Sequence, residues 1–435
     1  IREFGYYEFS PCFASLAPRP SPLAMILITL LLCAAQNTFE IPGTSRWDGM
    51  GMSTFILDDL NGDGVAEMGG AAFCTDYNGA NSGSVYVYDG ATATQIRRHD
   101  GAMRSSRLGR FATSIDDING DGVRDYAAGA PLESTFADAA GAVYVWSGAT
   151  GQRLAWISGD VANGKLGTAI ASIDDLDGDG TPDLFVGAPG ERSGDGRIYA
   201  FSGATGLEID HYNGRSSNGG FGTSLDAVGD VNGDGIEDFA GGEPFAHSNK
   251  GDVHIISGSN FHRIRTISGA NLNAWFGYRV ACIGDADGDG KIDMLIGEPC
   301  KDTVHLYNIS GSRLRKHEGP GAQSGGPKQG WGHSIASAGD LDEDGYDDYV
   351  LGAPGEWAGF NFVNPGAATK IFSGWNGSLL LSVPPTGADD GFGSSLCVGI
   401  ATPSNGKQVL LIGAPAAGNL SNHQATGLVF GVVLP

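Results

Sequence analysis

The sequence contains little that would support a helical, membrane-spanning or disulfide-rich protein. No stretch keeps a helical spacing of apolar residues between caps, and no apolar run is long enough to cross a bilayer. Only 6 of the 435 residues are cysteine, and the absence of a C-x-x-C pair excludes common zinc-ligand spacings. Basic residues are few, 26 against 50 acidic ones, and the net charge of −24 disfavours nucleic acids and anionic membranes as partners.

The sequence is instead rich in glycine and in short acidic loops. Glycine makes up 71 residues, over twice its usual share of about 7%, which suits a chain with many tight turns. Asp285–Asp293 reads Asp-Ala-Asp-Gly-Asp-Gly-Lys-Ile-Asp and has carboxylates at positions 1, 3, 5 and 9. Alternate side chains of a tight loop point to one centre, and four such oxygens repel one another unless a cation lies between them. Calcium, which takes about 6–8 oxygen ligands, fits best, and the carbonyl of Lys291 at position 7 would complete its ring.

Six loops of this kind recur, with their first residues 58, 58, 55, 55 and 55 positions apart. Acidic turns without a metal would not need an oxygen-bearing side chain at positions 1, 3, 5 and 9 every time. We therefore predict six calcium sites, in which position 7 contributes its backbone carbonyl. The predicted ligands are Asp59, Asn61, Asp63, Val65, Glu67, Asp117, Asn119, Asp121, Val123, Asp125, Asp175, Asp177, Asp179, Thr181, Asp183, Asp230, Asn232, Asp234, Ile236, Asp238, Asp285, Asp287, Asp289, Lys291, Asp293, Asp340, Asp342, Asp344, Tyr346 and Asp348.

The loops belong to a larger internal repeat. Each unit opens with a large apolar residue and glycine, as in Phe221-Gly222, and the apolar stretch after the loop ends in Gly-Ala-Pro or Gly-Glu-Pro, as in Gly242–Pro244. An alternating strand such as Val143–Trp146 follows, and then a turn and a fourth strand such as Arg153–Ile157. Four short strands per unit in seven units predict an all-β, seven-bladed β-propeller of four-stranded antiparallel blades.

Together these motifs resemble the FG-GAP repeat of integrin alpha-chain propellers and their bacterial relatives. The resemblance covers residues 37–435 and implies that each calcium loop joins the first two strands of its blade, on the face opposite the ligand-binding loops. The sequence departs from the family in three ways. The even loop spacing leaves no room for an inserted adhesion domain, and residues 401–406 replace the loop of the seventh unit. Because the sequence stops at Val433–Pro435, we also expect no stalk, transmembrane span or tail.

We expect two parts, a leader at residues 1–36 and the propeller at residues 37–435. The apolar run Leu23–Cys33 is typical of a secretory signal with cleavage before Gln36, and Met25 is an alternative start. A lipid anchor at Cys33 is the other possibility, although Leu32 is bulky for such a site. We also predict that Asn37–Pro42 pairs with Gly427–Val433 to complete blade seven, which would remove exposed strand edges.

Charge and cysteine usage agree with this picture. The predicted ligand positions hold 21 of the 50 acidic residues, so six calcium ions would bring the net charge of −24 to about −12. Without metal, the loops should be strained by repulsion between like charges. Cys74 and Cys300 fall in different blades, and Cys282 and Cys300 at opposite ends of one hairpin, so we expect no disulfide between the members of either pair.

The sequence contains no G-x-S-x-G, H-E-x-x-H or other nucleophile–base motif, which argues against an enzyme. His254 and His305 stand where other units have tyrosine, so we expect ordinary strand residues, and Trp331 should be a core residue. The long loop 355–366 contains Trp357, Phe360 and Phe362, which form either a recognition patch or a cover over their own blade.

We therefore predict a secreted or cell-surface, monomeric, calcium-stabilised module that binds an extracellular protein or glycan. An enzyme acting on extracellular polysaccharide and a purely structural matrix component are the alternatives.

Overall fold

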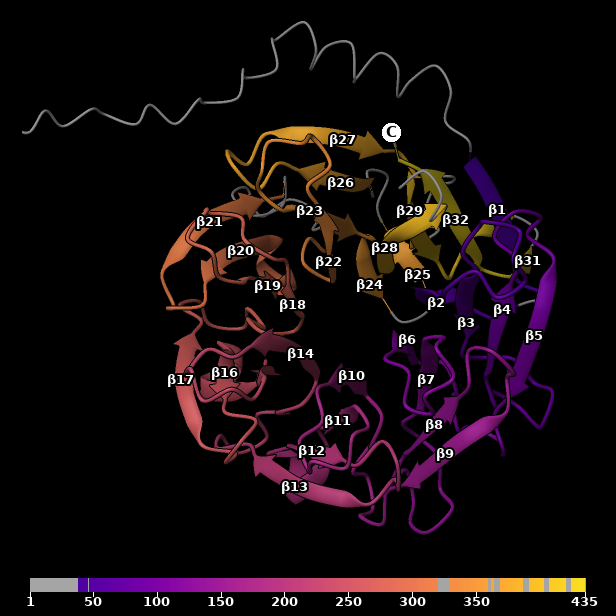
Figure 1. Ribbon diagram of the computed structural model, residues 1–435, viewed down its shortest axis with the longest axis horizontal. Coiled ribbons are helices and arrows are strands. Elements are labelled where there is room, and N and C mark those ends of the chain that lie inside the picture. The colour runs from indigo at the N-terminus through magenta and orange to yellow at the C-terminus, as the bar shows by residue number, and fades with distance from the viewer. Residues whose placement is uncertain are drawn as a thin grey trace, which may run out of the picture. The chain divides into compact units, whose positions relative to one another are not determined.

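The computed structural model describes residues 38–45, 47–319, 329–358, 361–363, 368–385, 391–402, 407–419 and 424–434. Its seven four-stranded antiparallel sheets are arranged as blades around a central axis (Figure 1), so the protein is an all-β, seven-bladed propeller. The predicted leader lies outside the described residues.

Blades 1 to 6 each use four strands, with the first strand innermost and the fourth outermost (Figure 1). The strands of blades 1 to 3 are β2 (Met50–Ile56), β3 (Met68–Ala72), β4 (Ser84–Tyr88), β5 (Gln95–Asp100), β6 (Phe111–Ile115), β7 (Asp125–Ala130), β8 (Ala142–Trp146), β9 (Arg153–Ser158), β10 (Ala169–Ile173), β11 (Asp183–Ala188), β12 (Arg197–Phe201) and β13 (Glu208–Asn213). Those of blades 4 to 6 are β14 (Ser224–Gly229), β15 (Asp238–Glu243), β16 (Asp252–Ile256), β17 (Arg263–Ser268), β18 (Val280–Cys282), β19 (Asp293–Glu298), β20 (Thr303–Asn308), β21 (Arg313–Glu318), β22 (Ser334–Gly339), β23 (Asp348–Ala353), β26 (Ala368–Phe372) and β27 (Leu379–Val383).

The seventh blade closes the ring by joining both ends of the propeller. It consists of β28 (Ser395–Thr402), β29 (Lys407–Ala414), β32 (Leu428–Val433) and β1 (Thr38–Pro42). Strand β1 is the outermost strand of this blade and runs antiparallel to β32, with Thr38 opposite Val432 and Pro42 opposite Leu428. The two strands lie side by side in Figure 1. The predicted pairing of the N-terminal segment into blade seven is therefore confirmed.

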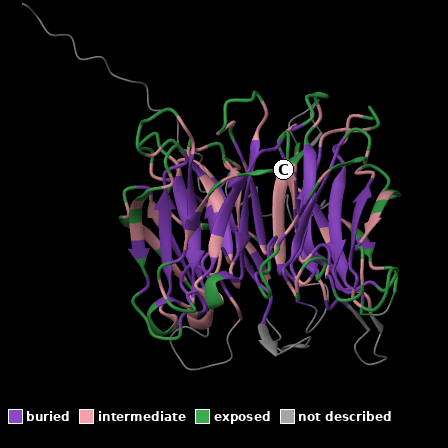
Figure 2. Cartoon of the chain, turned by 90° about the horizontal axis from the view of Figure 1, so that it is seen from below, coloured by how far each residue is buried: buried purple, intermediate pink, exposed green. Residues whose placement is uncertain are grey.

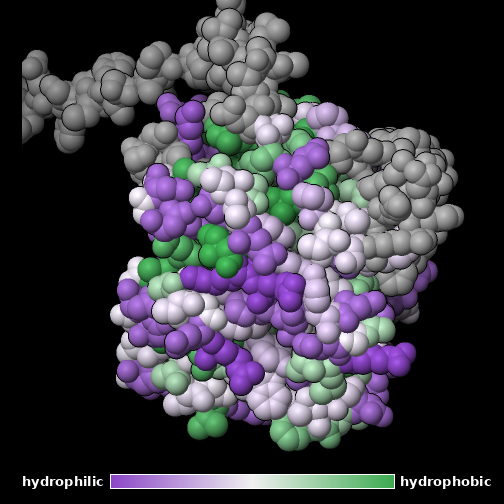
Figure 3. Space-filling model, turned by 90° about the vertical axis from the view of Figure 1, so that its right-hand side faces the viewer, coloured by the Kyte–Doolittle hydropathy of each residue, from purple (hydrophilic) through white to green (hydrophobic). Residues whose placement is uncertain are grey.

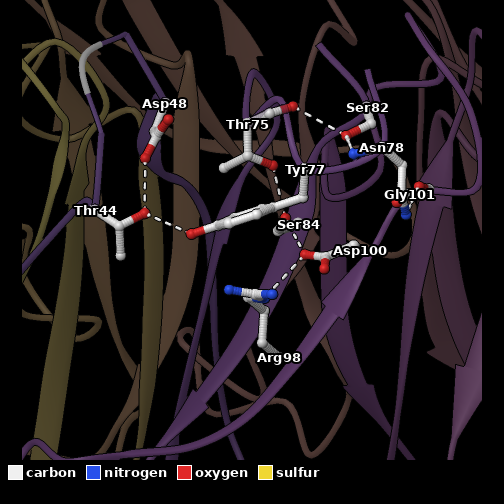
Figure 4. Close-up of polar contacts among 10 residues, drawn as sticks. All are labelled: Thr44, Asp48, Thr75, Tyr77, Asn78, Ser82, Ser84, Arg98, Asp100 and Gly101. Carbon is white, nitrogen blue, oxygen red and sulfur yellow. Dashed lines mark hydrogen bonds and ion pairs between the residues drawn. The ribbon is translucent and has the colours of Figure 1, made fainter. Parts of the chain in front are cut away.

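The segment after β1 is bonded to the first blade through a polar network (Figure 4). The hydroxyl of Thr44 donates to Asp48 Oδ2 at 3.0 Å and lies 3.2 Å from the hydroxyl of Tyr77. The Arg98 guanidinium stacks 3.8 Å from the Tyr77 ring centroid and pairs with Asp100 at 3.1 Å. These contacts tie the closing segment to the loop between β3 and β4 and, through Tyr77, to β5 of the first blade.

Glycine–glycine contacts explain why both repeat motifs require this residue. The glycine of the Gly-Ala-Pro motif in one blade faces the Phe-Gly glycine of the next, as Gly187 faces Gly222 and Gly242 faces Gly277. A Cβ on either of the first pair would collide with backbone atoms of the other blade. Gly222 also has a φ of +87°, a conformation that residues with a Cβ rarely adopt. The two motifs therefore meet at the contact between neighbouring blades.

The core lies between the blades and is formed largely by the second and third strands, which are almost entirely buried. Figure 2 shows buried residues along most strands and exposed ones in the loops at both ends. The large residues of the Phe-Gly motifs are also buried. Phe221 and Phe392 are 0% exposed, and Trp331 at 4% exposure is a core residue as predicted. The outer strands face solvent, and on the side that carries β1 and β5 hydrophilic side chains alternate with scattered hydrophobic ones (Figure 3).

Several smaller features complete the fold. Short helical segments, α2 (Glu191–Gly194), α3 (Ala246–Asn249) and η1 (Pro299–Lys301), follow the second strands of blades 3 to 5. Two extra hairpins, β24 (Glu356–Ala358) with β25 (Asn361–Val363) and β30 (Gly418–Asn419) with β31 (Gln424–Ala425), extend blades 6 and 7. Cys74, Cys282 and Cys397 are free thiols. Among the described residues, no helix is long and apolar enough to span a membrane.

Candidate metal centres

The six acidic loops each connect the first and second strands of a blade. Asp285–Asp293, for example, leaves β18 and ends on the first residue of β19. Because the strands of each blade alternate in direction, these loops share one end of the ring with the turns between the third and fourth strands. The opposite end carries the loops between the second and third strands. The structure thus confirms that each acidic loop joins the first two strands of its blade.

Backbone hydrogen bonds preshape every loop around its first carboxylate. In the fifth loop, Asp285 Oδ1 accepts from the N–H groups of Gly288 at 2.5 Å and Asp289 at 3.1 Å, and Oδ2 accepts from Gly290 at 2.7 Å. The bonds from positions 5 and 6 recur in all six loops. In the sixth loop Glu343 replaces the first glycine and adopts a φ of +56° to keep the same turn.

The residues at positions 5 and 7 are linked in the same way. The N–H of position 7 donates to the position-5 carboxylate at 2.8–3.1 Å in every loop, which sets the orientation of the surrounding peptides. The residues concerned at position 7 are Val65, Val123, Thr181, Ile236, Lys291 and Tyr346.

The carboxylate at position 9 is the most buried member of each loop. It stands at the beginning of the second strand and is 0% exposed in all six cases, Glu67, Asp125, Asp183, Asp238, Asp293 and Asp348. One of its oxygens accepts from the N–H of position 2 at 2.7–3.0 Å. Each buried carboxylate is thereby held against its own loop.

Three loops bring carboxylate oxygens from three residues within 4.8 Å of one another. The groups are Asp175 with Asp177 and Asp183, Asp285 with Asp287 and Asp289, and Asp340 with Asp342 and Asp344. The other three loops have asparagine at position 3, namely Asn61, Asn119 and Asn232, whose amide oxygen accepts from the N–H of position 5 at 2.8–2.9 Å.

Two observations test whether the loops fit a cation. Buried oxygens of three predicted ligands, Glu67 Oε1, Asp293 Oδ1 and Asp342 Oδ1, have no hydrogen-bond partner. In blades 2, 3, 4 and 6, by contrast, the second oxygen of the position-9 carboxylate accepts from a backbone N–H at 2.8–3.0 Å. An all-oxygen set of carboxylates, amides and carbonyls with unused lone pairs is the chemistry that calcium prefers. The residues therefore fit the ion.

The raised pKa values of the buried loop carboxylates also favour a bound cation. Burial raises the pKa of Asp293 to about 7, and repulsion from Asp287, Asp285 and Asp289 adds to the effect. Burial likewise raises the pKa of Asp348 to about 7 and that of Asp125 to about 6, again with repulsion from neighbouring loop carboxylates. A divalent cation among these groups would relieve the cost of holding them charged.

The opposite end of the ring contains a buried contact that the sequence analysis missed. In blades 2 to 5 a glutamate at or just after the end of the second strand bonds to the third residue of the third strand. The four contacts are Glu133 with Tyr144, Glu191 with Tyr199, Glu243 with His254 and Glu298 with His305, all at 2.8 Å. His254 and His305 lie in strands, as expected, but each has a specific acidic partner. The available signal was the change from Gly-Ala-Pro to Gly-Glu-Pro in the two units that carry histidine.

A second cluster lies where the innermost strands begin. Arg279 of blade 5 donates from Nε to the carbonyl of His333 in blade 6 at 3.2 Å, and its guanidinium lies 5.9 Å from the ring centroid of Phe111 in blade 2. Burial lowers the pKa of His333 to about 3, assisted by Arg279 and Arg110. Because blades 5 and 2 are not neighbours, these side chains meet across the axis of the ring.

The long loop of blade 6 forms a hairpin, in which Trp357 stands opposite Phe362. The side chains of Trp357 and Phe362, and Phe360 as a whole, lie outside the described residues. The choice between a recognition patch and a cover stays a prediction.

Comparison with known proteins identifies the repeats. The family model described as FG-GAP repeat matches residues 110–146, 166–201 and 221–256, and the model described as FG-GAP-like repeat matches residues 285–351. These matches cover the units of blades 2 to 6 in part or in full.

Relatives and solved structures agree with the repeat matches. The chain is 26% identical to integrin alpha-V of Gallus gallus over 61% of this chain and 25% of the relative. It is 34% identical to integrin alpha-5 of Xenopus laevis over 37% and 16%, and 37% identical to integrin alpha-PS5 of Drosophila melanogaster over 31% and 15%, respectively. The matched parts thus span a quarter or less of these relatives. A crystal structure of BBS1N in complex with ARL6DN, soaked with lead, superposes on 91% of this chain and 96% of its own with a TM-score of 0.56 at 10% identity, which supports the fold alone.

Proposed function

Because the chain is an FG-GAP-repeat propeller similar to integrin alpha chains, we propose that it binds six structural calcium ions at one end of the ring and an extracellular protein or glycan at the other. The proposed ligands are positions 1, 3, 5, 7 and 9 of each loop, as predicted from the sequence. Calcium has a structural role here and catalyses no reaction. By binding the ligands of one loop it holds together the ends of the two strands that the loop connects. The protein acts on the cell surface or in the extracellular space as a monomer.

The recurring loop geometry carries this proposal. Six loops share the same backbone bonds to the first carboxylate, and each ends in a fully buried acid. A buried carboxylate without a compensating charge is costly, and six equivalent cases at equivalent positions favour a common ion. At a free calcium concentration of about 100 times the Kd of a site, binding to that site would add about 2.7 kcal/mol to the free energy of unfolding.

The face opposite the calcium loops is proposed as the binding surface because its loops vary most between blades. Blade 3 has α2, blade 4 has α3, blade 5 has η1 and blade 6 has the β24–β25 hairpin at this position, although all four share the same strand framework. A rigid framework with variable loops is the usual arrangement of a binding protein.

Calcium titration tests the first half of the proposal. The melting temperature of the full chain should fall on chelation and recover on adding calcium, because the ion binds only the folded loops. Asp293→Asn should lower the calcium stoichiometry by one, whereas Asp138→Asn, which removes an exposed carboxylate outside the loops, should leave it unchanged. A melting temperature that stays the same when a chelator removes calcium would contradict the structural role of calcium.

Binding itself is tested on protein and glycan arrays with and without calcium. Retention of a defined protein or glycan that depends on calcium supports the binding module. Failure to bind any target, with normal calcium stoichiometry, would favour the purely structural role.

The cluster of Arg110, Arg279 and His333 near the axis is the place to test the alternative of an enzyme. It combines two arginines and a histidine near the start of the innermost strands. A proton donor or acceptor should titrate near neutral pH, whereas the pKa of His333 is about 3. The cluster is therefore better suited to contact an anionic group than to move a proton.

A further inference from the structure

Blade 4 differs from the other blades at the point where the second strand passes to the third. The last residue of the second strand stands directly opposite the first residue of the third. These pairs are Ala72 with Ser84, Ala130 with Ala142, Ala188 with Arg197, Glu243 with Asp252, Glu298 with Thr303, Ala353 with Ala368 and Ala414 with Leu428. Among these seven described pairs, only that of blade 4 consists of two carboxylates.

Both carboxylates of this pair are removed from solvent. Glu243 is 0% exposed and Asp252 is 3% exposed. Like charges directly opposite each other destabilise a sheet, and burial increases the cost. The pair therefore requires positive charge close by.

Two histidines approach the pair from different sides. His254 lies two residues after Asp252, and its Nε2 is 2.8 Å from Glu243 Oε2. Nδ1 of His247, in α3, is 3.1 Å from Asp252 Oδ2, and its side chain is 64% exposed. Ligand atoms of Glu243, Asp252 and His254 all lie within 4.8 Å of one another. The group thus offers two carboxylate oxygens and two imidazole nitrogens, with one imidazole open to solvent.

We propose that Glu243, Asp252 and His254 bind a transition-metal ion, with Zn²⁺ as the best fit, and that His247 supplies the fourth ligand. Mixed imidazole and carboxylate donors suit zinc, whereas calcium prefers oxygen alone. The ion would replace the proton between His254 and Glu243 and neutralise both acids.

The surroundings of His254 are those of a metal ligand. Its Nδ1 lies 2.9 Å from the hydroxyl of Thr266, which can accept the Nδ1 proton and leave Nε2 free for a metal. Glu243 Oε1 accepts from the backbone N–H groups of Arg215 at 3.1 Å and Ser216 at 2.8 Å, so this carboxylate is held in place. Metal could enter beside the exposed His247.

Blade 5 provides an internal control. Glu298 and His305 repeat the glutamate–histidine contact at 2.8 Å, but Thr303 takes the place of Asp252. The glutamate–histidine pair alone is therefore a structural contact of the fold, and Asp252 is what distinguishes blade 4. This site is independent of the calcium loops, which lie at the other end of the ring.

The test uses the full chain, saturated with calcium and freed of other metals, and titrates it with Co²⁺ and Zn²⁺. We expect one Co²⁺ per chain with the visible absorption of a four-coordinate site, displaced by Zn²⁺. Asp252→Asn, which keeps the shape of the side chain, should abolish this signal. His247→Ala removes the exposed fourth ligand and should weaken Co²⁺ binding.

The blade 5 variant His305→Gln should bind Co²⁺ as the wild type does, and melting curves with calcium check that all variants fold. Zn²⁺ should raise the melting temperature of the wild type but not of Asp252→Asn. The proposal is overturned if the wild type binds no Co²⁺ or Zn²⁺ at micromolar concentration, or if Asp252→Asn binds equally well. It also fails if the signal depends on His305. None of these outcomes affects the calcium stoichiometry, so the proposed function is judged separately.

Discussion

The contact between glycines of neighbouring blades yields a quantitative prediction for Gly187→Ala. The new Cβ would lie 3.0 Å from the carbonyl carbon of Gly222 in the next blade and closer still to its oxygen, whereas ordinary Cβ contacts begin near 3.4 Å. The obstructing atoms are backbone, so relief requires two blades to separate. Overpacking of this kind costs about 1–3 kcal/mol, and we expect the upper end because no flexible side chain can move away.

The expected change in melting temperature follows from the size of the unit. For about 400 residues the unfolding entropy is about 0.8 kcal/mol/K, so 3 kcal/mol corresponds to about 4 °C if the ring unfolds cooperatively. Gly206→Ala is the matched control. Its φ of +69° costs about 1 kcal/mol, but its nearest neighbour, Ile157 Cγ1, would lie at an ordinary 3.6 Å. It should therefore shift melting by only about 1 °C.

Scanning calorimetry in saturating calcium measures both variants against the wild type. Equal shifts for Gly187→Ala and Gly206→Ala would refute the reasoning, because the collision of Gly187→Ala with the next blade is expected to cost more than the positive φ of Gly206→Ala. An unchanged melting temperature for Gly187→Ala would show that the blades separate without cost.

Three further predictions concern pH and ring closure. Burial raises the pKa of Asp226 to about 6, above its unfolded value, so its charge is destabilising above pH 6. Asp226→Asn, which can still accept from the N–H of Cys282, should therefore be more stable than the wild type at pH 8 and lose this advantage towards pH 4 in urea titrations. Burial lowers the pKa of His99 to about 4, below its unfolded value, so stability is lost as pH falls from about 6.5 to 4. His99→Gln should lessen that loss, and an identical pH profile would contradict the assignment. Deleting residues 1–42 removes β1 and leaves β32 as an open edge, so this variant should aggregate in light scattering, and a monodisperse product would show that β1 is dispensable.

The acidic loops show how far local sequence carries a prediction. Their hydrogen bonds join residues two to seven positions apart, as from Gly290 to Asp285 and from Ala286 to Asp293, so a nine-residue pattern contains nearly all the information needed to place them. The number of blades and the closing strand could likewise be predicted, because the repeat spacing and the missing fourth strand of unit seven are visible in the sequence.

Contacts between distant residues were decided only by the tertiary structure. The sequence shows that Gly187 and Gly222 recur, but not that they touch across two blades. His254 looked like a substituted tyrosine until strand pairing placed Glu243 beside it and Asp252 opposite Glu243. Arg279 reaches the ring of Phe111 because closure of seven blades brings opposite walls together across the axis. Local spacing determines the shape of each loop and strand, whereas register and ring curvature determine which of their side chains meet.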